Sequence, residues 1–323
     1  MIRLQSNGAM LAIIGYAGLF TLLLPLLICG GSVSPARSQS GAPNLKSAPL
    51  PTYRPGTKFV YSDGTWETVL KVGPDGVTWK NHRNFTSTGS PDFTYKRFKW
   101  QTRDRYGYRD FEQTRFLLAP RTTSLWPLQV GNKTRFDENG RWFDEFGYEH
   151  QYDSFWSCEV MGTETVSVGA GQFDTWKITC RRYPDKFTST SKVREYRTWY
   201  YAPSVGHWVI EIRDYNGFAE NRRKELVAVL PDLLTFTADQ DDILLVQKQF
   251  QNALESNRNG VTSVWENFQQ QLVIGVTPVK SYKHPDGTIC RQYNQIIAKE
   301  GLPYEYPGIA CRTPKGRWDV PRR

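Results

Sequence analysis

Cysteine is the residue type in this chain whose spacing most clearly suggests chemistry. The 323 residues include five cysteines, at Cys29, Cys158, Cys180, Cys290 and Cys311. Strand alternation points Cys158 and Cys180 toward an apolar face, because hydrophobic residues lie two positions from each. We expect the local pairs Cys158–Cys180 and Cys290–Cys311 to form disulfides, each closing a loop of about 20 residues, which leaves Cys29 over.

Other constellations that would support catalysis or metal binding are absent from the sequence. There is no CxxC pair, and the histidines His82, His150, His207 and His284 are scattered without an HExxH spacing. The chain also lacks a GxSxG nucleophile elbow. We therefore expect no metal, no cofactor and no enzymatic activity; a hydrolytic alternative would require a pocket in which a histidine and an acid converge on a nucleophile.

Residues 91–115 combine basic and aromatic side chains, a combination that binds anionic ligands. The favoured interpretation is a hairpin whose aromatic side chains face the core and whose bases face water. The alternative is contact with an anionic surface through Lys96, Arg97, Lys99, Arg103 and Arg105. The whole chain has 41 Lys and Arg against 32 Asp and Glu, a net charge of +9, which suits anionic lipid or glycan. Nucleic acid is not an expected partner outside the cell.

The N-terminal residues predict export. Residues 9–28 are apolar and uncharged after a single Arg3, so residues 1–29 are expected to be a signal peptide or a membrane anchor. Residues 26–30 resemble a bacterial lipobox, in which the cysteine becomes acylated, although Ile28 departs from the small residue usual before it. Acylation of Cys29, cleavage near residues 34–40 and an uncleaved anchor all remain open. Residues 30–52 are rich in Ser, Pro and Gly, which predicts a disordered tether.

The body of the chain has the composition of a β protein. Aromatic residues make up 14%, with 26 Gly and 19 Pro, and a mean hydropathy of -0.55 excludes a polytopic membrane protein. Turn signals separate short extended runs at Ser62-Asp63-Gly64, Pro74-Asp75-Gly76, Glu138-Asn139-Gly140, Pro285-Asp286-Gly287 and Pro314-Lys315-Gly316. Residues 53–232 are expected to form an antiparallel β-domain, a curved sheet or half-barrel.

One segment has helical periodicity. Within residues 239–257, Ile243, Val246 and Leu254 fall on one face, acids occupy the first turn, and Gly260 follows the end. We expect residues 239–323 to form a small α+β domain with one helix on an antiparallel sheet. The predicted fold class is therefore mainly β.

The C-terminal stretch, roughly residues 253–320, resembles the seventeen-kilodalton surface-antigen family of bacterial outer-membrane lipoproteins. The matching motifs are Ala253-Leu254-Glu255, Trp265-Glu266-Asn267, Gly275-Val276-Thr277-Pro278, Cys290-Arg291-Gln292-Tyr293 and the run from Ala310 to Trp318. The chain departs from the family at residues 268–274 and lacks the N-terminal glycine zipper of many members. The resemblance implies a lipid-anchored envelope protein without known catalysis.

Residues 166–178 and 198–206 are similar to periplasmic domains related to the lipoprotein-carrier half-barrel, which implies a concave sheet able to hold a hydrophobic ligand. The leading hypothesis is a non-enzymatic envelope lipoprotein, anchored to the outer membrane or periplasmic, with a structural or interaction role. Its expected partners are the membrane, through an N-terminal lipid or anchor, and envelope proteins. The alternative is a carrier or binder of a lipid or other amphiphile, which would require a continuous apolar concavity with open space inside it, lined by some of the many tryptophans.

Overall fold

A computed structural model describes residues 42–95, 97, 99–104, 107–117, 124–144, 146–184 and 192–321. The expected signal peptide or anchor, Cys29 and the first part of the tether lie outside these residues. Within them, no helix combines the length and the apolar character needed to cross a membrane.

Twelve strands form the N-terminal part of the fold. They are β1 (Lys58–Tyr61), β2 (Trp66–Gly73), β3 (Gly76–Asn81), β4 (Thr86–Gly89), β5 (Lys99–Asp104), β6 (Gly107–Leu117), β7 (Lys133–Phe143), β8 (Glu149–Val168), β9 (Gly171–Pro184), β10 (Glu195–Ala202), β11 (His207–Asp214) and β12 (Arg222–Leu230). A 3-10 helix, η1 (Phe93–Tyr95), lies between β4 and β5.

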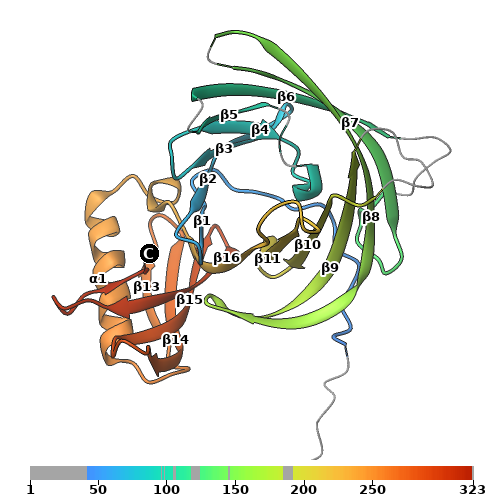
Figure 1. The fold of residues 1–323 in the computed structure, drawn as a ribbon. Coiled ribbons are helices and arrows are strands. Elements are labelled where there is room, and N and C mark those ends of the chain that lie inside the picture. The colour runs from blue at the N-terminus through green and yellow to red at the C-terminus, as the bar shows by residue number, and fades with distance from the viewer. Residues whose placement is uncertain are drawn as a thin grey trace, which may run out of the picture. The chain divides into compact units, whose positions relative to one another are not determined.

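These strands form the expected curved antiparallel sheet, as Figure 1 shows. Each strand pairs antiparallel with the next along the chain, and β1 also pairs with β12. The sheet therefore curves back on itself around an interior. The turn between β1 and β2 lies at the expected Ser62-Asp63-Gly64, where Gly64 has φ 77° and the Asp63 carboxylate accepts hydrogen bonds from Thr65.

The expected turn at residues 138–140 is wrong. Glu138, Asn139 and Gly140 lie in the middle of β7, where they pair with β8. Gly140 serves a different purpose: it lies opposite Tyr152, whose ring occupies the space that a β-carbon at position 140 would need. The glycine therefore reflects a close side-chain approach within the sheet.

Residues 42–52 also differ from the expected tether. Ala48 is 2% exposed and forms an isolated β-bridge with Leu128. The Leu128 N–H donates to the Ala48 carbonyl at 2.7 Å, and the Thr163 hydroxyl donates to the Pro43 carbonyl at 2.6 Å. Because these contacts satisfy two of its carbonyl groups and bury the Ala48 side chain, this segment packs on the sheet despite its composition.

The C-terminal part is the expected α+β arrangement. Its elements are η2 (Leu233–Thr235), α1 (Gln240–Ser256), β13 (Ser263–Asn267), β14 (Leu272–Lys283), β15 (Ile289–Lys299), β16 (Leu302–Arg312) and β17 (Trp318–Asp319). The Asp239 carboxylate caps α1 by accepting from the Asp241 N–H. The predicted apolar face of α1 is buried, including Ile243, Val246 and Leu254.

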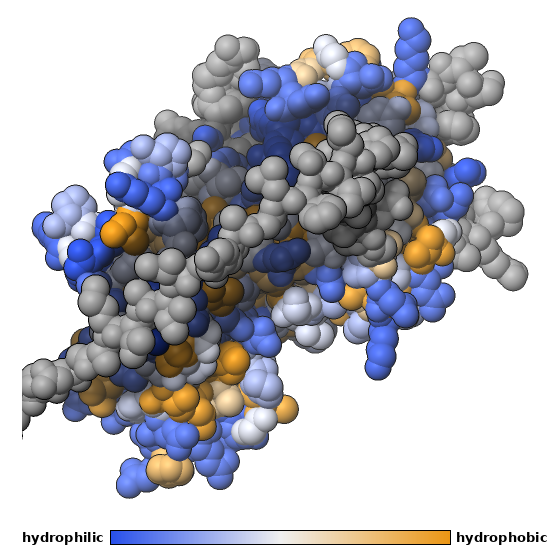
Figure 2. All heavy atoms as spheres, turned by 90° about the horizontal axis from the view of Figure 1, so that it is seen from below, coloured by the Kyte–Doolittle hydropathy of each residue, from blue (hydrophilic) through white to orange (hydrophobic). Residues whose placement is uncertain are grey.

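The two parts meet along several contacts. Strand β12 pairs with β16 where Ala228 lies opposite Gly308, and a β-carbon at Gly308 would lie 2.9 Å from the Ala228 β-carbon. The Arg54 guanidinium lies between the rings of Phe236 and Tyr304, 4.1 and 4.0 Å from their centroids. Residues 41–323 thus form one compact unit. On the face seen in Figure 2, apolar residues gather in separate groups among hydrophilic ones.

Candidate ligand-binding cavity

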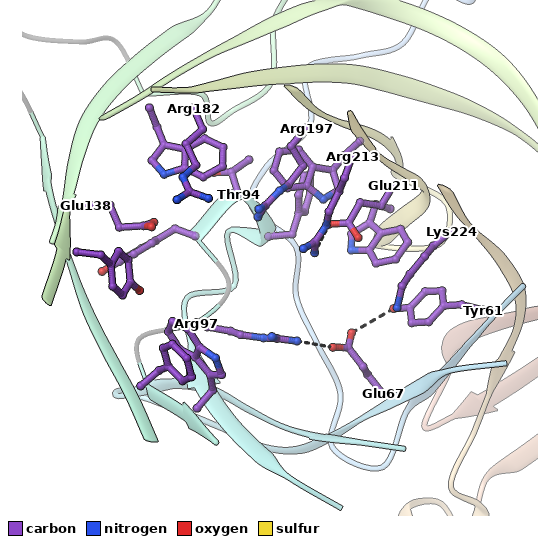
Figure 3. Close-up of a pocket in the computed structure, with 18 of the residues that line it drawn as sticks. Tyr61, Glu67, Thr94, Arg97, Glu138, Arg182, Arg197, Glu211, Arg213 and Lys224 are labelled. Atoms are coloured by element: carbon purple, nitrogen blue, oxygen red, sulfur yellow. Dashed lines mark hydrogen bonds and ion pairs between the residues drawn. The ribbon is translucent and has the colours of Figure 1, made fainter. Parts of the chain in front are cut away.

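A cavity of about 450 Å³ lies inside the curved sheet. Its walls come from β1, β2, η1 and β5 to β12, so nearly every strand of the sheet contributes. Figure 3 shows its labelled side chains arranged around the space. The volume falls in the range of roughly 300 to 1,000 Å³ that is usual for small-molecule sites.

Aromatic rings make up about half of the cavity lining. The ten aromatic lining residues are Tyr61, Phe93, Tyr95, Trp100, Phe111, Trp142, Tyr152, Trp156, Trp199 and Trp208. The tryptophans of this set therefore border a cavity, and they do not simply interdigitate in a solid core. Open space inside the sheet is one of the two conditions for an amphiphile carrier, and a continuous apolar lining is the other.

One wall carries a row of stacked rings. Trp100, Phe111, Trp142 and His150 occupy directly opposed positions on β5, β6, β7 and β8. Successive ring centroids are 4.8, 6.0 and 3.9 Å apart, and the ring planes are nearly parallel. Such cross-strand pairs stabilise the sheet and fix its register, so this row gives the cavity a firm wall.

Charged side chains alternate with the rings around the same cavity. The lining includes five bases, Arg97, Arg182, Arg197, Arg213 and Lys224, and three acids, Glu67, Glu138 and Glu211. This lining is not the continuous apolar concavity that a carrier of a bare acyl chain would need, because a chain lying here would cover buried ionic groups.

The wall formed by β9, β10 and β11 concentrates the bases. Arg182 and Arg197 share one carboxylate, Glu195, with N–O distances of 3.5 and 2.6 Å. Arg213 pairs with Glu211 at 2.9 Å. The carboxylates are the deeper groups, since the side chains of Glu195 and Glu211 are 2% and 8% exposed, whereas the three arginine side chains are 21 to 35% exposed.

The electrostatics of this wall follow from burial and proximity. Burial alone would raise the pKa of the Glu211 carboxyl, but the Arg213 and Arg197 guanidinium groups hold that pKa below its ordinary value. Burial and the nearby positive charge of Arg213 lower the pKa of Arg197. The Glu211 carboxylate is therefore kept ionised, and two cationic groups lie close together beside the cavity.

A buried hydrogen-bond chain links β11 to β1 and to the segment before β1. His207 is fully buried, and its ring nitrogens lie 3.0 Å from the hydroxyls of Tyr53 and Tyr61. Tyr61 also donates to a Glu67 oxygen at 3.4 Å, and Glu67 pairs with Arg97. Because Tyr61 gives its proton to Glu67, the network assigns the His207 Nε2–H as the donor to Tyr61.

This hydrogen-bond network brings a histidine and an acid to one hydroxyl, which is the arrangement that a hydrolytic active site would require. However, Tyr61 is 2% exposed and stacks on Trp208 with centroids 4.6 Å apart. Burial, reinforced by the Glu67 carboxylate, raises the pKa of Tyr61, whereas an activated nucleophile needs a lowered pKa. In this arrangement His207 and Glu67 hold the Tyr61 ring in place in the cavity wall.

The bases expected on an anionic surface fall in different places. Arg97 lines the cavity and pairs with Glu67 at 3.4 Å, while Lys99 is exposed on β5. Lys96, Arg105 and the side chain of Arg103 lie outside what the structure describes. Contact of these residues with an anionic surface stays a prediction.

The arginines of the β9–β11 wall were missed by sequence reasoning. The available signal was the i, i+2 spacing of a base or acid with a second functional residue on one strand, as in Arg197 and Trp199, or Glu211 and Arg213. No local motif indicates that pairs of this kind on separate strands point into the same cavity.

The two expected disulfides are present. Cys158 and Cys180 lie directly opposite each other on β8 and β9, as do Cys290 and Cys311 on β15 and β16. Within the described ranges, no three His, Cys, Asp or Glu side chains are grouped as metal ligands.

The C-terminal motifs serve to hold helix and sheet together. Arg291 donates to the Leu254 carbonyl and, at 2.7 Å, to the Asn257 carbonyl at the end of α1. The Trp318 indole N–H donates to Glu255 at 2.9 Å, and Arg312 donates two hydrogen bonds to the same carboxylate. These residues have structural roles in the fold.

The C-terminal part of the chain is similar to known proteins. Residues 252–319 match the protein family described as 17 kDa outer membrane surface antigen, which confirms the resemblance seen in the sequence. The 17 kDa surface antigen of Rickettsia bellii is 37% identical over 82 residues, covering 25% of this chain and 52% of that protein. The corresponding antigen of Rickettsia conorii is 35% identical over the same length. The chain thus spans about half the length of the curated relatives it matches.

Among solved structures, the hypothetical lipoprotein YmcC from Escherichia coli (K12) is similar at 10% sequence identity and a TM-score of 0.35. The similarity covers 58% of this chain and 90% of that one.

Proposed function

We propose that this protein is a non-catalytic lipoprotein of the bacterial cell envelope that binds a small amphiphilic ligand inside its curved sheet. The observation that carries the proposal is the cavity of about 450 Å³, whose lining combines aromatic rings with paired charges. Rings provide apolar contact area and the charged groups provide orientation and specificity, which is the usual composition of a ligand site.

The envelope assignment is supported by two independent features. The C-terminal residues match a family described as an outer membrane surface antigen, and residues 26–30 resemble a lipobox ahead of Cys29. An acyl group on Cys29 would tether the body to a membrane, where anionic lipid, glycan or other envelope proteins are available as partners.

Mass spectrometry of native protein extracted from membranes tests both parts of the proposal. We expect a mature chain that begins at acylated Cys29 and a co-purifying small molecule. Cys29→Ser should abolish incorporation of a fatty-acid analogue, while Ser32→Ala should not. A mature chain that begins at Met1 would contradict lipidation.

A matched pair of tryptophan variants tests the location of the ligand. Trp142→Ala removes a ring that lines the cavity, whereas Trp66→Ala removes a half-buried ring that does not. We expect the co-purifying molecule to be lost only with Trp142→Ala. Equal retention of this molecule in both variants, or wild-type protein that carries no co-purifying molecule, would favour a structural or interaction role instead.

A further inference from the structure

Beyond the presence of a ligand, the structure assigns an oxyanion subsite to the wall formed by Arg182, Arg197 and Arg213. We infer that the ligand carries a phosphate or carboxylate group, which binds to these guanidinium groups. The inference rests on the proposed function and names the chemistry of its ligand.

The first argument is the arrangement of charge. Three guanidinium groups on β9, β10 and β11 are balanced by only two carboxylates, because Arg182 and Arg197 share Glu195. Figure 3 shows all three groups pointing into the cavity from the same side. An oxyanion placed between them would neutralise the remaining positive charge.

The second argument is the layering of this wall. The side chains of Glu195 and Glu211 are nearly inaccessible to water, whereas the arginines that pair with them are more exposed and line the cavity. The Ser154 hydroxyl also accepts from Arg182 Nε at 3.2 Å. Buried partners therefore hold the arginines in place before any ligand arrives, which lowers the entropic cost of binding.

The third argument is unused hydrogen-bonding capacity. Arg213 gives one N–H of Nη2 to Glu211 at 2.9 Å, and its other nitrogens have no hydrogen-bond partner among the residues that the structure describes. A planar guanidinium suits bidentate contact with phosphate or carboxylate. Burial and the positive charge of Arg213 both lower the pKa of Arg197, so an anion beside Arg197 is further favoured.

The fourth argument concerns the rest of the ligand. Trp199 and Trp208 line the cavity from β10 and β11, the same strands that carry Arg197 and Arg213. Elsewhere in the lining, the Glu67 carboxylate is already paired with Arg97. The subsite therefore fits a ligand that places its anionic group at this wall and packs its remainder on the tryptophan rings.

Matched probes test the subsite in the full-length protein. Dodecyl phosphate, neutral dodecyl maltoside and cationic dodecyltrimethylammonium share one chain length, while inorganic phosphate and glucuronate carry the anion without the chain. Binding is followed by tryptophan fluorescence at two ionic strengths. We expect dodecyl phosphate to bind at least about tenfold more tightly than the neutral probe, with the difference reduced by salt.

Variants then locate the binding. Arg213→Gln should lower the affinity for dodecyl phosphate about tenfold or more, and Arg213→Lys should restore part of it, because lysine keeps the charge but not the planar fork. Arg223→Gln, in the ion pair with Glu225 on β12 and half exposed, is the control and should bind like wild type. Urea unfolding shows whether each variant is folded.

The outcomes separate the two proposals. Equal binding of the phosphate and maltoside probes would overturn the subsite and leave the cavity as an amphiphile site. Arg213-dependent binding of phosphate or glucuronate without any amphiphile would support the subsite and overturn the amphiphilic ligand. Failure of every probe to bind would overturn both, and preference for glucuronate over dodecyl phosphate would identify a sugar acid as the source of the anion.

Discussion

At the scale of single residues, Glu211 shows how this fold keeps a charge away from water. Its side chain is 8% exposed, yet the pKa of its carboxyl is lowered because Arg213 and Arg197 outweigh the effect of burial. A buried carboxylate without such partners would instead become protonated. The cationic wall therefore depends on the acids paired with the arginines as much as on the arginines themselves.

Glu211 should make stability depend on pH. Its pKa is lower in the folded than in the unfolded protein, so its contribution is complete above the ordinary glutamate value of about 4.3 and is lost as pH falls through the folded-state pKa. Glu211→Gln should therefore reduce the free energy of unfolding most above that value. Urea unfolding across this pH range checks it; parallel wild-type and variant curves would contradict the assignment, and Glu225→Gln on an exposed pair is the control.

Residue-level prediction succeeded where the determinant was local. The disulfide pairs followed from strand alternation and short separation, and both are present. The cavity residues could not be found in this way, because Glu67, Arg182 and Lys224 come from three strands far apart in the sequence. Only the curvature of the sheet brings them together.

At the scale of elements, β7 shows how a glycine can be misread. The turn predicted at Ser62-Asp63-Gly64 follows β1 as expected, because its turn chemistry is explicit in the sequence. In β7, Asn139-Gly140 has the sequence of a hairpin turn, but the chain continues as a strand. Tertiary packing decided this, since Tyr152 needs the space beside Gly140.

Gly140→Ala tests that reading. A methyl group at this position would overlap the Tyr152 ring, so we expect a loss of about 1 to 3 kcal/mol in the free energy of unfolding, the usual cost of overpacking. The same substitution in a Tyr152→Ala background should cost much less, because the obstructing ring is absent. Equal costs in the two backgrounds would refute the steric explanation and point to a backbone cause.

The end of α1 depends on an element of the other layer. Arg291 on β15 bonds to the Leu254 and Asn257 carbonyls and to the Asn259 side chain, which supplies donors to the last turn of the helix. Arg291→Gln should cost about 2 to 3 kcal/mol and increase hydrogen exchange near residues 253–257. Arg312→Gln breaks only an exposed pair and should cost less than about 1 kcal/mol.

At the scale of the whole molecule, the junction between the β-strands and the C-terminal part could not be predicted from the sequence. The helix after it was recognisable from its periodicity, but no local signal indicates that residues 41–323 form one compact unit. The connection itself is packed: Phe236 is 4% exposed and contacts both Arg54 and Tyr306. Arg54 precedes β1 by only a few residues, so the segment before β1 and the connection after β12 meet at this point.

Phe236 should therefore couple the unfolding of the two parts. Phe236→Ala removes a buried ring, with an expected loss of about 3 kcal/mol, and exposes the connection at residues 231–239 to protease. We expect wild type to unfold in one urea transition, and the variant in two, with cleavage within this connection under native conditions. Leu234→Ala, two residues away and 60% exposed in wild type, should leave both measurements unchanged. A single transition without new cleavage in Phe236→Ala would contradict this role. It would mean that the remaining contacts couple the parts, among them the β12–β16 pairing and the hydrogen bonds from the Gln292 side chain to the Val168 and Gly169 carbonyls.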